Sequence, residues 1–277
     1  MRKVLFLSAV LAFVGPVELR AHDMFLKMKT FFLPPQAPVA IALFNGTFDK
    51  SENAIGRDRM QDVSIVGPEN EVEHPSDAQW RDESQTSWLD FRAGRRGSYV
   101  AGVSTRPRVL ELSGEEFDEY LEHDGVLDVL EARTREGELR NEARERYSKH
   151  VKAIFQVGER RSGAYRHLLG YPVEFVPGEN PYRLKAGDHF EVVLLRDGEA
   201  VPNHLVYASY EGFHGQGDGD RHREAVKTRT NADGVARFEL KEPGMWYVRT
   251  IHMVRVDEPD VDYESNWATL TFQVRQR

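Results

Sequence analysis

Short apolar runs alternate with turn-forming residues in two regions of the chain, residues 22–112 and 159–277. The first region contains runs such as VAIALFNG and TSWLDFRAG, and the second contains HFEVVLLRDGEAVPNHLVYASY, with a turn at Asp197-Gly198. Short strands joined by tight turns at this spacing are typical of immunoglobulin-like and transthyretin-like sandwiches. The pattern predicts a mainly β protein with two such β-sandwich domains.

Between these regions, residues 113–158 have a helical pattern. Ser113 followed by Glu116 has the spacing of a capping box, and Gly125 separates two short helical stretches. A longer stretch, ELRNEARERYSKHVKAIFQVG, carries apolar residues at helical spacing on a charged background. Its apolar residues are Tyr147, Val151, Ile154 and Phe155. The sequence therefore predicts a small α-helical insert between the two sandwiches.

Residues 1–21 have the pattern of a secretory signal peptide. A short basic start precedes an apolar run that is too short for a membrane span of about 20 residues, and Ala21 offers a small residue for cleavage. The expected product is exported to the periplasm and has no membrane span after cleavage. The chain has a net charge of −8, which argues against nucleic acid as a partner, and no cysteine, which excludes disulfides, thiolate metal sites and thiol nucleophiles.

Cleavage after Ala21 would make His22 the first residue of the exported protein. Its free α-amine and its imidazole Nδ1 could then chelate one metal ion, and nitrogen ligands of this kind suit copper and nickel. The alternative is a solvated chain end with no role.

Two other positions could supply ligands. In WYVRTIHMVRV, strand alternation places His252 on an apolar face with Trp246, and the acidic run that follows includes Glu264. His252 could instead be a hydrogen-bonded core residue, and Glu264 part of a solvated loop. The glycine-rich loop with His214, Asp218, Asp220 and His222 is a further candidate, although its spacing does not match a calcium loop.

The chain resembles an exported bacterial family of unknown function whose usual label associates it with nickel uptake. The resemblance rests on AHDMFLK, VEFVPGENPYRLKAGD, GMWYVRTIHM and YESNWATLTF, among other segments. It implies that His22, His252 and Glu264 match the pattern of that family.

Together these observations predict a soluble periplasmic protein that binds nickel or copper for uptake or handling, with a transport system of the envelope as a possible partner. We expect His22 to meet His252 and Glu264 across the face between the two domains. One alternative is a glycan-binding or envelope-binding module that uses Trp80, Trp88 or Trp246. Another is a copper-dependent oxidase or oxygenase, although the sequence contains no G-x-S-x-G, H-E-x-x-H or phosphate-loop motif.

Overall fold

Three β-sheets make up most of the protein, which is described here from a computed structural model covering residues 22–213 and 224–277. The main path of the ten-stranded central sheet runs, in order, through β15 (Val226–Arg229), β14 (Leu205–Tyr210), β17 (Gly244–Glu258), β18 (Val261–Val274), β10 (Arg140–Val157), β8 (Gly97–Thr105), β4 (Met60–Val66) and β5 (Val72–Glu73). Two further strands of this sheet, β2 (Phe32–Leu33) and β9 (Arg108–Ser113), pair with β10.

Two four-stranded sheets accompany the central sheet. One has the order β1 (Asp23–Lys27), β3 (Pro38–Gly46), β7 (Thr86–Arg92) and β6 (Trp80–Glu83). The other is built on β12 (His189–Arg196), which pairs with β11 (Val173–Pro177), β13 (Glu199–Ala200) and β16 (Val235–Glu239). Short 3-10 turns occupy Arg57–Arg59, Asp77–Gln79, Gly163–Arg166 and Pro181–Arg183. This architecture confirms the predicted mainly β class.

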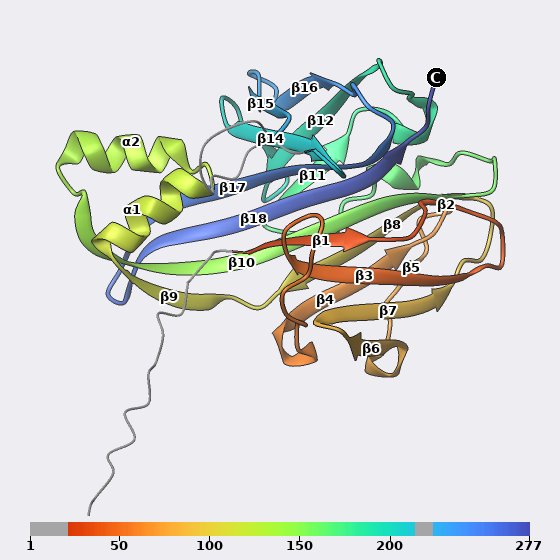
Figure 1. Ribbon diagram of the computed structural model, residues 1–277, viewed down its shortest axis with the longest axis horizontal. Coiled ribbons are helices and arrows are strands. Elements are labelled where there is room, and N and C mark those ends of the chain that lie inside the picture. The colour runs from red at the N-terminus through yellow and green to blue at the C-terminus, as the bar shows by residue number, and fades with distance from the viewer. Residues whose placement is uncertain (1–21, 214–223) are drawn as a thin grey trace, which may run out of the picture.

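The two smaller sheets cover opposite faces of the central sheet. Thr269 and Thr271 of β18 donate hydrogen bonds to carbonyl groups of β1, whereas Lys152 of β10 pairs with Glu174 of β11 at 2.8 Å. Because side chains alternate along a strand, odd-numbered residues of β10 and β18 face the β1 sheet and even-numbered residues face the β11 sheet. Figure 1 shows β10, β17 and β18 running side by side, with β1 and β3 on one side of them and β11 and β12 on the other.

Strands from all three segments distinguished in the sequence meet in this central sheet. β8 comes from residues 22–112, β10 from residues 113–158, and β17 and β18 from residues 159–277. β10 pairs with β18 on one side and with β8 on the other, so it connects the C-terminal part of the chain to the N-terminal part.

The prediction of a long helix in the segment after residue 137 was wrong, because Arg140–Val157 forms β10, an 18-residue strand. The second half of β10 is buried on both faces. It therefore lacks the alternation of apolar and exposed polar residues that marks a strand with one face in solvent. Lys149, His150 and Lys152 are buried as well. In the sequence, these polar residues between apolar ones resemble the polar face of an amphipathic helix. The insert is helical only over α1 (Gly114–His123) and α2 (Leu127–Glu136).

The capping box at the start of α1 is confirmed. The Ser113 hydroxyl accepts from the Glu116 amide at 3.4 Å, and the Glu116 carboxylate accepts from the Ser113 amide at 3.0 Å. Gly125 separates the helices at a positive φ of 78°, and an added Cβ there would lie 2.5 Å from the Tyr207 hydroxyl. Both the backbone conformation and the lack of space therefore favour glycine at this break.

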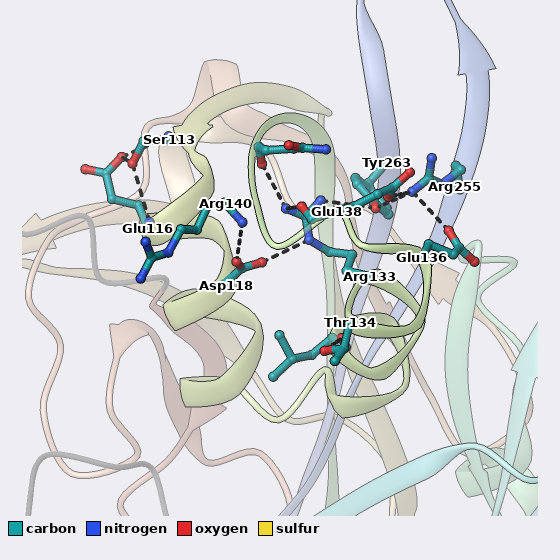
Figure 2. Close-up of polar contacts among 12 residues, drawn as sticks. Ser113, Glu116, Asp118, Arg133, Thr134, Glu136, Glu138, Arg140, Arg255 and Tyr263 are labelled. Atoms are coloured by element: carbon teal, nitrogen blue, oxygen red, sulfur yellow. Dashed lines mark hydrogen bonds and ion pairs between the residues drawn. The ribbon is translucent and has the colours of Figure 1, made fainter.

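A buried arginine fixes the two helices to the sheet (Figure 2). The Arg133 guanidinium donates to the Asp118 carboxylate at 3.0 Å and to the carbonyls of Glu138 and Asn141 at 3.0 and 2.8 Å. It also reaches the Tyr263 hydroxyl of β18 at 3.4 Å. One side chain thus links α1, the chain after α2 and the central sheet.

Within the described residues, no helix is long and apolar enough to cross a membrane.

We expect Arg133→Met to destabilise the protein by about 2–4 kcal/mol, because Asp118 and two carbonyl groups would lose a buried donor. Urea unfolding followed by circular dichroism measures the change. Arg135→Met, at an exposed position on the same helix, is the matched control. Equal stabilities of the two variants would contradict the role given to Arg133.

Candidate functional site

A cavity of about 300 Å³ lies beside His22, between the β1 sheet and the central sheet. Its walls include Glu145, Tyr147 and Lys149 of β10 together with Trp267 of β18, all at odd-numbered positions. Tyr120 of α1, Asp58, Arg59 and Arg108 also line it, together with the uncharged polar residues Asn45, Asn53 and Thr105. The cavity therefore combines ionisable groups with aromatic rings, as small-molecule sites do.

His22 lies at the edge of this cavity and is held by two contacts. Its Nε2 lies 2.5 Å from the Glu52 carboxylate, and its backbone carbonyl accepts a hydrogen bond from the Lys149 ammonium. The carboxylate favours the tautomer that carries a proton on Nε2, which leaves the lone pair on Nδ1. His22 is therefore oriented with one ring nitrogen free to act as a ligand.

Lys149 is buried in the cavity wall. Its Nζ lies 5.0 Å from the centre of the Trp267 ring and 5.8 Å from that of Tyr147. Burial lowers its pKa to about 8, although nearby carboxylates act in the opposite direction. Among the described residues, no carboxylate oxygen lies within 4.0 Å of this amine.

Glu145 is the buried acid of the cavity. Its Oε1 accepts hydrogen bonds from the Tyr120 hydroxyl at 3.0 Å and from the Ser265 hydroxyl. Removal from solvent raises the pKa of Glu145 to about 7, even though both hydrogen bonds lower it. The cavity thus contains an acid and an amine whose charges both change close to neutral pH.

His252 lies on the other face of the central sheet, and it shares that face with Trp246 as the alternation predicted. It is 9% exposed, and burial together with the neighbouring His204 lowers its pKa to about 4, so its imidazole is neutral at pH 7. The rings of His252 and His204 are 5.2 Å apart. The Nδ1 of His252 is buried without a hydrogen-bond partner within the described residues.

Glu264 also faces the β11 sheet, where it takes part in an ion-pair cluster. Its carboxylate lies 2.6 Å from the Arg146 guanidinium, which also binds Glu258 at 2.6 Å. On the same face, His150 contacts the Ser104 hydroxyl and the Asn266 side chain, each at 2.9 Å. Glu264 is therefore occupied as the counter-ion of an arginine.

The structure does not bring His22 together with His252 and Glu264. His22 contacts Lys149, an odd-numbered residue of β10, whereas Glu264 and His252 share the even-numbered face with Asn266. The central sheet separates the two sets. Among residues 22–213 and 224–277, no group of three or more His, Cys, Asp or Glu side chains could hold a metal ion. The candidate loop from His214 to His222 lies outside the described residues.

The tryptophans considered for a glycan surface do not form one strip. Trp246 is fully buried, and the Arg57 and Arg81 guanidinium groups cover the rings of Trp80 and Trp88 at 4.4 and 5.0 Å. Sequence reasoning missed Lys149 and Glu145 because both lie in the segment predicted to be helical. The available signal was the sequence SKHVKAIF, in which Lys149, His150 and Lys152 lie beside or within a short apolar run that could form a buried strand.

We expect the stability of the protein relative to a Glu145→Gln variant to fall as pH rises from 5 to 8. Between the ordinary pKa of 4.5 and about 7, the folded state keeps a proton on Glu145 that the unfolded state has lost. The free energy of unfolding therefore falls as pH rises through this window. The expected change is about 2–3 kcal/mol. Urea unfolding at several pH values measures it, with the exposed Glu115→Gln as control. A difference that does not vary with pH would contradict burial of an ionisable Glu145.

Comparison with known proteins finds the family of this chain and distant structural similarities. No curated protein matches the sequence. Among solved structures, α-2-macroglobulin from Escherichia coli is 10% identical, with a TM-score of 0.25 over 91% of this chain and 16% of that one. A DUF4785 protein from Legionella pneumophila is 9% identical, with a TM-score of 0.25 over 81% of this chain and 50% of that one. The D0-D1 domain of intimin is 10% identical, with a TM-score of 0.19 over 91% of this chain and 98% of that one.

The chain thus spans half or less of the length of the first two of these structures. The family described as "Domain of unknown function (DUF4198)" matches residues 19–254, a range that includes His22, the cavity residues of β10 and His252. The chain belongs to this family.

Proposed function

We propose that the protein is an exported metal-binding protein that holds nickel or copper through His22 at the edge of the cavity. The observation that carries this proposal is the 2.5 Å contact between the Nε2 of His22 and the Glu52 carboxylate. Histidines that bind metals commonly donate their second ring N–H to a carboxylate, which fixes the tautomer and orients the ring.

The donor chemistry fits these two metals. Cleavage after Ala21 would free the α-amine of His22, so that one residue offers an amine and the Nδ1 lone pair to the same ion. Amine and imidazole nitrogens suit copper and nickel, which stand high in the affinity order of divalent metals. The resemblance to a family associated with nickel uptake agrees with this choice and favours a transport system of the periplasm and envelope as the destination of the metal.

The proposal places His252 and Glu264 outside this metal site. They lie across the central sheet from His22, and the Glu264 carboxylate is paired with Arg146. The described residues add no cluster of acidic or histidine side chains around His22. The remaining coordination positions would therefore be filled by water or by a ligand that arrives with the metal.

Titration calorimetry with nickel and with copper at pH 7.5 tests the proposal on protein whose N-terminus is verified by mass spectrometry. We expect His22→Ala to weaken binding at least a hundredfold, and Glu52→Gln to weaken it about 10- to 100-fold through loss of ring orientation. The parent affinity should fall with acid, because the α-amine, with a pKa near 8, must lose its proton.

Two controls separate the chelate from nonspecific binding by histidine. One extra alanine before His22 moves the free amine away from the imidazole and should weaken binding as much as His22→Ala does. His189→Ala removes an exposed histidine elsewhere and should change nothing. Unchanged affinity in the His22→Ala protein would overturn the proposal.

A further inference from the structure

Lys149 differs from every other buried cation of the described residues. Of the five buried lysine and arginine side chains, four have a carboxylate within 4.0 Å. These pairs are Lys27 with Glu211 at 2.9 Å, Arg133 with Asp118 at 3.0 Å, Lys152 with Glu174 at 2.8 Å and Arg249 with Asp23 at 3.4 Å. Lys149, by contrast, has two uncharged oxygen acceptors, the His22 carbonyl and the Asn45 side chain at 3.4 Å.

A buried ammonium group without a counter-ion is costly, and proteins normally pair such groups. Asp23, Asp124 and Glu145 act on Lys149 only from a longer distance. Burial raises the pKa of both Asp124 and Glu145. Among residues 22–213 and 224–277, the ammonium group of Lys149 therefore has oxygen acceptors but no carboxylate within 4.0 Å.

This lysine lines the cavity of about 300 Å³ beside His22. Arg59 and Arg108 line the same cavity, and the exposed Arg108 adds positive charge to its lining. Trp267 offers an apolar surface for the body of a ligand. Its ring stacks on that of Tyr120, with ring centres 6.1 Å apart. Cations and aromatic walls therefore occur together around one space of small-molecule size.

We propose that this cavity binds a small organic carboxylate, whose head group pairs with Lys149 and whose apolar body packs against Trp267 and Tyr147. The ligand supplies the counter-charge that the other buried cations obtain from the chain itself. Binding requires no metal, so this site goes beyond the metal-binding function proposed above.

Calorimetry and tryptophan fluorescence on protein treated with chelator test the proposal, with benzoate as probe. Benzamide has the same shape without the charge, and inorganic phosphate has charge without an apolar body. We expect benzoate to bind at least tenfold more tightly than benzamide or phosphate. If benzamide binds as tightly as benzoate, the negative charge plays no part in binding. If phosphate binds as tightly as benzoate, the apolar body plays no part, and either result would overturn the proposal.

Variants identify the groups involved. Lys149→Met should weaken benzoate binding at least tenfold while leaving thermal stability equal or higher, because it removes an unpaired buried charge. Lys241→Met, at an exposed position, is the matched control. Arg108→Ala, also exposed, tests the same site without altering a buried residue and should weaken benzoate binding and reduce its dependence on salt. Unchanged benzoate affinity in either cavity variant would contradict the proposal.

These results are separable from those of the metal experiments. Benzoate binding is measured without metal, and nickel or copper binding is measured without benzoate. Loss of metal binding in His22→Ala together with retained benzoate binding would show two independent functions of the same cavity region. Failure of benzoate binding would leave the chelate at His22 untouched.

Discussion

The parallel pairing of β10 with β18 is the constraint on which the rest of the structure depends. It joins the middle and C-terminal segments of the chain in one sheet, which β8 extends to the N-terminal segment. Its register assigns each side chain of the two strands to one face of that sheet. Glu145, Lys149 and Trp267 consequently share the cavity side, while Glu264 and Asn266 share the other side. A shift of the register by one residue would exchange these two sets, because side chains alternate along a strand.

Burial of both faces explains why Lys149, His150 and Lys152 lie inside the molecule. The second half of β10 lies between two covering sheets and has no solvent-exposed side, so its charged residues are enclosed with it. Lys152 is neutralised by Glu174, whereas Lys149 faces open space beside His22. The same strand therefore supplies a buried ion pair on one face and part of the cavity wall on the other.

Sequence patterns predicted the local features well. The capping box of Ser113, the break at Gly125, the turn at Asp197-Gly198 and the buried face of His252 all depend on neighbouring residues, and all are present. The same reasoning failed for β10, where apolar residues at helical spacing lie in a strand buried on both faces. Periodicity reports how exposure varies along a segment, so it cannot distinguish helix from strand where exposure does not vary.

The sequence by itself determined the mainly β class and the two short helices. The tertiary structure alone decided which chemical groups meet. It separated His22 from His252 and Glu264, placed Glu52 against the imidazole, and buried Lys149 with no carboxylate of the described residues within 4.0 Å. The physical reason is that pairing of distant strands and stacking of sheets set these contacts, and neither leaves a local pattern along the chain.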